Sequence, residues 1–364
     1  MGSLRSSRRV GIRCYYTNRY LRKLKQGNAP LTGIYRSALA KLPEGSPEYQ
    51  ALAESGKIWE NHFRPQNLEP YLAAQSKLKE TLKCVDELQD IMLEWDHRFN
   101  SITRSLVAQY ARQSTSIKSH SLPIGPVSVI AKELDRRFFK NIDNLASMKA
   151  SDLAGLRLPS AGALLPGADE RRVSETRNHL VVSRYLFKLA LTNPGTSGVP
   201  LSDISSLCSI ILAGTQAEVN HWFKRIRPGD YHNLPIRLAS NPKRIFPYQF
   251  EVPGCMERFI QWRDQMHHAQ QLHPLILATH IYIYFTHIHP FPYGNGTTGR
   301  SLMADYMIRQ KYIPVVFLDL DRKEHIKSIS DAQDGNPEDL CASVVDALGQ
   351  MLLQFNLREH ELIE

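Results

Sequence analysis

The chain has 364 residues and a formal net charge of +9 at pH 7, with 45 basic and 36 acidic side chains. This length suits one large domain or two smaller ones. Ten of the basic side chains and none of the acidic ones lie in residues 1–43, which leaves 35 basic against 36 acidic residues in the rest. A nearly neutral body excludes the broad basic footprint of a nucleic-acid-binding domain, so we expect no nucleic-acid partner.

Residues 1–43 are predicted to be a basic N-terminal arm or targeting segment, and three interpretations stay open. An arginine-rich, acid-free start resembles a mitochondrial transit peptide. The run Met1-Gly-Ser-Leu-Arg-Ser6 also fits the N-myristoylation pattern, which we favour less, and a plain disordered arm is the third. The five cysteines are scattered and odd in number, which is typical of an intracellular, reducing compartment. No segment has the roughly 18 uncharged apolar residues that cross a bilayer, so we expect no transmembrane segment.

Residues 44–100 are predicted to form an N-terminal helical extension. Ser46-Pro47 is typical of a helix start, and we expect a short helix that continues to Ser55. From Glu69 to Trp95, leucines and other apolar residues recur at helical spacing, which predicts one long amphipathic helix. Such a stripe is more often a core face or a dimer seam than part of a cofactor site, so a homodimer stays open.

Residues 101–356 are predicted to form the main helical domain. Amphipathic patterns predict helices over 174–191, 201–212 and 337–355, and 272–287 is apolar nearly all round, as a buried central helix is. Between Pro228 and Val252 the helical spacing disappears and prolines recur, which indicates an extended hairpin or a loop, and we assign the hairpin to 236–250. The expected fold class is therefore all-α with one small β-hairpin, a bundle without a parallel sheet.

The loop from His289 to Arg300 reads His-Pro-Phe-Pro-Tyr-Gly-Asn-Gly-Thr-Thr-Gly-Arg and is the strongest indication of function. Its Gly294-Asn295-Gly296 stretch allows the backbone to turn its N–H groups inward as an anion nest. Thr297 and Thr298 are helix-capping residue types, and the N-terminus of the helix that follows favours phosphate. Arg300, one turn into that helix, can make forked contacts to a phosphate. The sequence therefore predicts a polyphosphate-binding loop beside a histidine.

This loop resembles the signature of the Fic (Fido) family, which is His-x-Phe-x-Asp/Glu-Gly-Asn-Gly-Arg-x-x-Arg. Six positions match at the right spacing, namely His289, Phe291, Gly294, Asn295, Gly296 and Arg300. The resemblance implies a mainly helical Fic/Fido domain over 101–356, with the hairpin at 236–250 as its flap. It also implies a nucleotidyltransferase that moves AMP from ATP, or another nucleoside monophosphate from its donor, onto a Ser, Thr or Tyr hydroxyl of a protein that docks along the flap (AMPylation).

The resemblance assigns a role to each residue of the loop. His289 is expected to be the general base, because an unperturbed imidazole titrates near 6.5. The nest formed by Gly294, Asn295 and Gly296, with Thr297 next to it, is expected to hold the β-phosphate and Arg300 the γ-phosphate, while Phe291 packs the loop into the core.

The pocket for the base of the nucleotide lies further along the chain in the resembling family, which commonly has an aromatic residue and an asparagine there. Here His325 and Gln333 occupy those positions. The identity of the nucleotide therefore stays open.

Two positions of the loop depart from the signature. Tyr293 stands where the family has the acid that holds Mg²⁺, and a phenol with a reference pKa of about 10 supplies no charge near pH 7. Thr297 stands where the family has its first arginine. We therefore expect weakened Mg²⁺ binding and assign no metal ligand, with Asp305 as the nearest acid in sequence that could replace the missing one.

Residues 114–122 resemble the inhibitory motif of the family, with Ser114 at its first position and Lys118 in place of its glutamate. In the family that glutamate pairs with the last arginine of the signature and blocks the γ-phosphate of the donor. A lysine cannot pair with Arg300, so the resemblance implies a chain that lacks this brake. An ordinary polar loop between two helices is the alternative.

Two other functions stay open beside transfer from ATP. The altered positions 293, 297, 325 and 333 suit a transferase that uses a different phosphate donor, as the family members that transfer UMP or phosphocholine do. The chain could instead be a non-catalytic nucleotide-binding or scaffold protein. Labelling that depends on a divalent ion would indicate a catalyst, and saturable nucleotide binding without product would indicate a binding protein.

Overall fold

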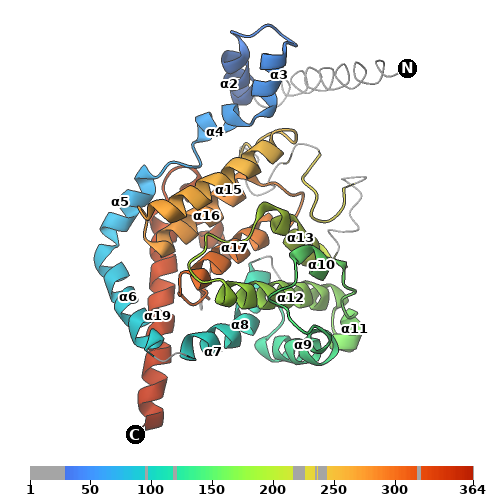
Figure 1. Cartoon of the computed structure of the whole chain (residues 1–364), viewed down its shortest axis with the longest axis vertical. Coiled ribbons are helices and arrows are strands. Elements are labelled where there is room, and N and C mark those ends of the chain that lie inside the picture. The colour runs from blue at the N-terminus through green and yellow to red at the C-terminus, as the bar shows by residue number, and fades with distance from the viewer. Residues whose placement is uncertain are drawn as a thin grey trace. The chain divides into compact units, whose positions relative to one another are not determined.

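The computed structural model describes residues 29–94, 97–117, 121–215, 226–233, 236, 244–317 and 321–363. These residues are mainly helical and contain no strand (Figure 1). The chain divides into a smaller unit, Met1–Arg64 with Leu234–Cys255, and a larger unit, Pro65–Asn233 with Met256–Glu364. The predicted domain boundaries near residues 43, 100 and 356 stay predictions.

The smaller unit contains α2 (Ala29–Leu39), α3 (Pro47–Glu54) and α4 (Lys57–Phe63). The side chain of Ser46 accepts a hydrogen bond from the backbone N–H of Tyr49 at 3.1 Å, so the predicted start of α3 is confirmed. Apolar side chains of these helices form a core with Tyr248. The buried carboxylate of Glu251 accepts hydrogen bonds from the hydroxyl of Tyr35 at 2.6 Å and from the backbone N–H of Tyr248 at 2.8 Å.

These contacts explain why the described part of the predicted hairpin, residue 236 and residues 244–250, contains no strand. The carbonyl of Ile245 accepts from the indole of Trp59 at 3.1 Å, and the N–H of Tyr248 is taken by the carboxylate of Glu251. Since side chains use these backbone groups, they are not available to a strand ladder, and the expectation of a strand over 244–250 is wrong. Residues 237–243 of the predicted flap lie outside the described residues.

In the larger unit the predicted long helix from Glu69 is two helices, α5 (Glu69–Lys77) and α6 (Lys79–Leu93). They meet at Leu78, whose backbone leaves helical geometry at φ −92° and ψ 8°. The change of direction lets both helices pack against α19 (Glu338–Ile363), and Figure 1 shows α6 running beside it. A stripe at helical spacing continues through such a bend, which is why the sequence pattern does not reveal the break.

The centre of the larger unit is formed by α8 (Val107–Ser116), α12 (Glu170–Thr192), α16 (Pro274–Ile288) and α17 (Asn295–Arg309). Every side chain of α16 from Leu275 to Ile288 is buried, which confirms the predicted central helix. α17 packs against α16 and α12, and α12 in turn packs against α8.

The other helices surround this centre or connect its parts. They are α7 (Arg98–Ser105), α9 (Ile124–Arg137), the 3₁₀ helix η1 (Phe139–Asn141), α10 (Ala150–Gly155), α11 (Ala161–Leu164), α13 (Leu201–Leu212), α15 (Val252–Ala269) and α18 (Arg322–Gln333).

One stretch of α19, Glu338–Leu357, is long and apolar enough to cross a membrane by length and composition alone. Its Leu340, Val344 and Leu348 are at most 1% exposed, as in a helix that packs into a protein core. Because core helices meet the same criterion, the match is weak evidence for a span.

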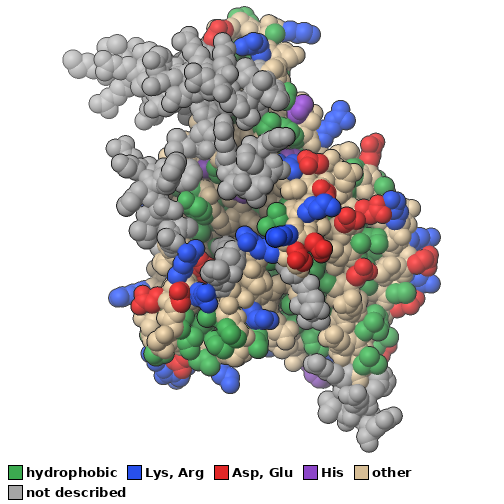
Figure 2. Space-filling model, turned by 180° about the vertical axis from the view of Figure 1, so that it is seen from behind, with side chains coloured by type: hydrophobic (Ala, Val, Ile, Leu, Met, Phe, Trp, Pro, Cys, Tyr) green, Lys and Arg blue, Asp and Glu red, His purple; other side chains and the backbone are tan. Residues whose placement is uncertain are grey.

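Charged side chains of both signs are interspersed on the face drawn in Figure 2, among the residues that the structure describes. Some form exposed ion pairs, such as Arg171 with Glu175 at 3.3 Å. The expectation of no nucleic-acid partner stays a prediction.

Candidate functional site

The turn between α16 and α17 positions the predicted loop, because the two helices approach each other closely. A Cβ atom added to Gly299 of α17 would lie 2.8 Å from the ring of Tyr282 and 3.0 Å from the methyl group of Thr286, both on α16. Only a residue without a side chain fits there. The apolar α16 and the glycine of α17 thus bring His289, at the end of one helix, next to the start of the other.

His289 is the C-cap of α16 and has a left-handed backbone, with φ 53° and ψ 55°. Such a conformation is uncommon for a residue other than glycine and costs of order 1–3 kcal/mol. Its ring is half-buried, and desolvation by the surrounding protein lowers the pKa of His289 to about 4, with the charge of His232 as the second cause. An ordinary imidazole titrates near 6.5, whereas the folded protein keeps this histidine neutral well below pH 6.

His232 is a site residue that the sequence analysis missed. It is 1% exposed, and its backbone N–H donates to the carbonyl of Pro290 at 3.0 Å. The neighbouring Tyr231 places its ring 5.7 Å from that of Phe291. Residues 231–232 therefore lie against the loop, although no spacing in the sequence links them to it.

Asn295 and Phe291 hold the loop in shape through reciprocal hydrogen bonds. The backbone N–H of Phe291 donates to the Asn295 side-chain oxygen at 2.9 Å, and the side-chain nitrogen of Asn295 donates to the Phe291 carbonyl at 2.7 Å. The ring of Phe291 is fully buried, which confirms its predicted packing role. Gly294 has φ 85° and precedes α17 as its N-cap without any side-chain cap.

The first turn of α17 carries buried hydroxyls that no described residue satisfies. Thr297 is 2% exposed and Thr298 fully buried, yet neither side-chain oxygen has a hydrogen-bond partner within the described part of the chain. Free N–H groups of a helix N-terminus and unpaired hydroxyl donors together suit an anion. The predicted capping role of the two threonines is not observed.

Arg300 is 4% exposed and reaches Ser114 at the end of α8. Its Nε and Nη2 donate to the Ser114 hydroxyl at 3.2 and 2.9 Å, and Nη2 also donates to the Ser114 carbonyl at 3.1 Å. Its Nη1 lies 3.3 Å from the position of a Cβ on Gly296. Within the described part of the chain, this buried guanidinium pairs with no carboxylate, and its hydrogen bonds go to the neutral Ser114. Lys118 of the predicted regulatory motif lies outside the described residues.

His325 and Gln333 of α18 take different positions. His325 is 5% exposed, with its ring centroid 6.4 Å from that of Tyr282 and 5.6 Å from that of Phe317. Burial and then the nearby charge of Arg300 lower the pKa of His325 to about 3, so its ring is neutral at pH 7. Its Nε2 has no partner among the described residues. Gln333 instead donates to the hydroxyl of Thr286 at 3.3 Å and is tied to α16.

The residues of the loop do not fit a magnesium site. Residues 289–300 contain no carboxylate, and Tyr293 stands at the position of the acid. Asp305, the suggested replacement, is fully buried and accepts a hydrogen bond from Nε of Arg309 at 2.9 Å. Its carboxylate is therefore paired with Arg309 and is not available to a metal ion. No group of three or more His, Cys, Asp or Glu side chains within the described ranges could hold a metal ion.

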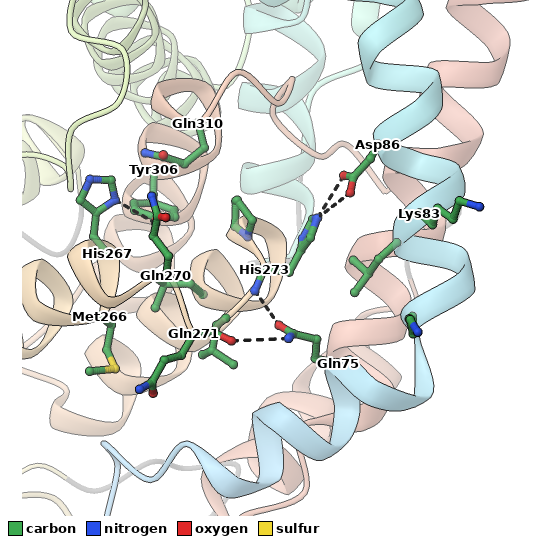
Figure 3. A pocket seen from close by; sticks show the side chains of 15 residues that line it. Gln75, Lys83, Asp86, Met266, His267, Gln270, Gln271, His273, Tyr306 and Gln310 are labelled. Carbon is green, nitrogen blue, oxygen red and sulfur yellow. Dashed lines mark hydrogen bonds and ion pairs between the residues drawn. The ribbon is translucent and has the colours of Figure 1, made fainter.

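A separate cavity of about 500 Å³ lies in the larger unit between α5, α6, α15 and α17, and its lining includes no residue of the loop. Figure 3 shows Asp86 reaching the ring of His273, where the distance is 3.0 Å. The Nδ1 atom of His273 accepts from the N–H of Leu275 at 3.2 Å and caps α16. Because both ring nitrogens are used, this histidine stabilises the start of α16 and is not available to a substrate.

Comparisons with known proteins connect the loop to a family. Residues 203–307 match the model of the Fic/DOC family. Over 127 residues the chain is 31% identical to two proteins named protein adenylyltransferase Fic, from Drosophila persimilis and Drosophila melanogaster. Each alignment covers 35% of this chain. It covers 24% of the Drosophila persimilis protein and 25% of the Drosophila melanogaster protein. The matched segment thus spans about a quarter of these relatives.

Solved structures share the fold. Fic-1 (residues 134–508) of C. elegans has a TM-score of 0.58 at 17% identity, covering 96% of this chain and 98% of that one. A Fic domain-containing signaling protein of Bacteroides thetaiotaomicron has a TM-score of 0.52 at 18% identity, covering 75% and 93%. At these identities the likeness shows the Fic fold alone.

Proposed function

Because this chain contains a Fic/DOC domain, we propose that it is a transferase that moves a nucleoside monophosphate, in the simplest case AMP from ATP, onto a protein hydroxyl. The observation that carries this proposal is the set of unsatisfied donors beside His289. Among the described residues, buried Arg300 has no acid partner, and the hydroxyls of Thr297 and Thr298 have no hydrogen-bond partner. Burying such groups is costly unless a ligand supplies acceptors, and phosphate oxygens do so.

In the proposed reaction the hydroxyl oxygen of the target attacks the reacting phosphorus of the donor. The bond to the leaving phosphate breaks, and the hydroxyl proton passes to His289, which is neutral because its pKa is lowered to about 4. A bound phosphate raises that pKa, since its negative charge favours the imidazolium, and so makes His289 a better base when the donor is present. The N-terminus of α17 and Arg300 stabilise the charge on the leaving phosphate.

His325 supports a contact with the donor, because its Nε2 has no partner among the described residues and the charge of Arg300 is near enough to lower the pKa of the ring. Gln333, which is bonded to Thr286, shapes that side of the site. Docking of the target protein along residues 236–250 and an intracellular location are further parts of the proposal.

Intact mass spectrometry tests the proposal without a known target, provided that the chain modifies itself. The purified chain is incubated with ATP, UTP, GTP, CTP or CDP-choline, each with Mg²⁺, Mn²⁺ or EDTA. We expect a mass increase of one donor fragment that is absent in His289→Ala and present in His268→Ala, a matched control because His268 is exposed. Undiminished labelling of His289→Ala would reject the mechanism.

A second function, nucleotide binding without turnover, is favoured by one observation. The acid position holds Tyr293, and Asp305 is bound to Arg309. This alternative predicts saturable nucleotide binding in calorimetry and no mass increase with any donor, with or without an added protein target.

A further inference from the structure

The loop from His289 to Arg300 contains one cationic side chain and no acidic one. A site for several linked phosphates normally distributes cations along them, because each added phosphate brings further negative charge. The number of phosphates that this loop can hold therefore depends on where Arg300 presents its free donors.

Arg300 presents those donors to the nest. Its Nε and Nη2 are held by Ser114, and its Nη1 lies 3.3 Å from the position of a Cβ on Gly296. The guanidinium thus lies back over the first turn of its own helix. A phosphate bound by the N–H groups at the N-terminus of α17 meets Arg300 as well, so the nest and the arginine form one phosphate subsite rather than two.

A third phosphate finds no further cation in this loop. Thr297, at the position where a second arginine would stand, offers only a neutral hydroxyl. His325, the other donor near Arg300, is also uncharged at pH 7. Counted over the described residues, one full charge and a helix dipole of about half a charge match a ligand with about two negative charges better than one with about four.

A metal ion held by the protein does not supply the positive charge that a triphosphate would still need. The loop has no carboxylate, and the ion pair with Arg309 uses the charge of Asp305. Mg²⁺ in a protein site usually retains at least one carboxylate ligand besides phosphate oxygens.

We infer that this site takes a nucleoside diphosphate ester and does so without a divalent ion held by the protein. Such a donor has two linked phosphates, one esterified to the nucleoside and the other to a second group. This inference rests on the proposed function. One phosphate reacts beside His289 and the other occupies the nest with Arg300. The target oxygen forms a bond to the reacting phosphorus, the bond from that phosphorus to the bridging oxygen breaks, and the second phosphate leaves as a monoester. The hydroxyl proton goes to His289.

Base-matched pairs of nucleotides test this inference, because the two members of each pair share one nucleoside and differ in their phosphates and in the group esterified to the second phosphate. Calorimetry on the full chain with His289→Ala, which prevents turnover, compares UDP-glucose with UTP, CDP-choline with CTP, NAD⁺ with ATP and GDP-mannose with GTP. In EDTA, we expect the diphosphate ester of the fitting base to bind at least tenfold more tightly than its triphosphate. Addition of Mg²⁺ should change the affinity of the ester less than threefold.

The outcomes separate the inference from the proposed function. A triphosphate that binds more tightly than its paired ester, or an ester that binds only with Mg²⁺, overturns the inference and leaves the transferase proposal intact. Absence of binding by all eight nucleotides overturns both.

Two substitutions supply the missing groups and make the test stricter. Thr297→Arg should raise the affinity for the triphosphate of the fitting base at least tenfold and leave that for the ester within threefold. Because Thr297 is buried, Tyr293→Asp, at a half-buried position, is the second variant, and it should make triphosphate binding depend on Mg²⁺. If both variants fold, as thermal melting reports, and neither improves triphosphate binding, the inference is wrong.

Discussion

The backbone N–H of His232 donates to the carbonyl of Pro290 over 3.0 Å, and this contact holds a second histidine next to His289. The charge of His232 disfavours a proton on His289 and contributes to its lowered pKa of about 4. His232→Asn removes that charge, so we expect the pKa of His289 to rise above about 4, which NMR titration of its imidazole measures. His268→Asn, a change at an exposed histidine, should leave the His289 titration unchanged. An unaltered titration in His232→Asn would show that desolvation alone sets this pKa.

Arg300 and Arg309 lie on the same helix and are both buried, but of the two only Arg309 has an acid partner among the described residues, Asp305 at 2.9 Å. Arg309→Gln leaves a buried carboxylate without its cation, and we expect a loss of about 3 kcal/mol in the free energy of unfolding. Arg300→Gln removes a buried charge that has no carboxylate among the described residues, so the loss of stability should be under about 1 kcal/mol. Nucleotide affinity should show the reverse order, with Arg300→Gln reducing it about tenfold or more.

Chemical denaturation ranks the two variants by their loss of stability. Calorimetry with the best-binding nucleotide ranks them by their loss of affinity. If Arg300→Gln unfolds as easily as Arg309→Gln and keeps its affinity, Arg300 is a structural residue and not a phosphate ligand.

Acid should weaken the fold through its buried histidines. Burial lowers the pKa of His280 to about 3 and that of His325 to about 3, whereas each titrates near 6.5 in the unfolded chain. Below 6.5 the unfolded state binds more protons, so the contribution of each histidine is full above that pH and is lost as the pH falls towards 3. Between pH 7 and pH 5.5 we expect each to lower the free energy of unfolding by about 1 kcal/mol.

Urea denaturation at pH 7, 6.5, 6 and 5.5 measures this slope. The slope should decrease in His280→Asn, which cannot take up the proton, and should stay the same in His268→Asn. An equal slope in His280→Asn and in the unmodified chain would contradict the assignment to His280.

Gly299 permits the close approach of α17 to α16, because a Cβ there would lie 2.8 Å from Tyr282 and 3.0 Å from Thr286. Gly299→Ala should therefore lower the free energy of unfolding by about 1–3 kcal/mol through overpacking. It should also reduce labelling, since the same approach positions His289. Gly33→Ala is the control, because a Cβ at that position of α2 meets nothing within 4 Å and should stabilise the chain by about 0.5 kcal/mol. Thermal melting that ranks the two variants in the opposite order would refute the packing argument.

Much of the site could be predicted from residues that are neighbours in the chain. The motif loop, the buried α16 and the helix after Gly294 all follow from short-range patterns, and the structure contains them. The family resemblance assigned Ser114 to a regulatory motif, whereas its hydrogen bonds to Arg300 are seen only in the structure.

Other features could not be predicted, because they depend on tertiary contacts. His232 reaches the loop through a backbone hydrogen bond, which no side-chain pattern encodes. The pKa of His289 depends on how deeply the ring is desolvated, and the bend at Leu78 leaves the apolar stripe of α5 and α6 intact. The hairpin was expected from the loss of helical spacing, the prolines and the family resemblance, whereas Trp59 and Glu251 take up the backbone groups that a strand over 244–250 needs.

The neutral environment of Arg300 has a consequence for how fast a ligand could enter. An arginine paired with a carboxylate has to give up that ion pair before it can bind an anion, and this exchange adds a barrier to association. Arg300 keeps its hydrogen bonds to Ser114 while its Nη1 faces Gly296. A phosphate can therefore join the guanidinium without displacing an anion first, and the rate of association should depend on ionic strength and on access to the loop.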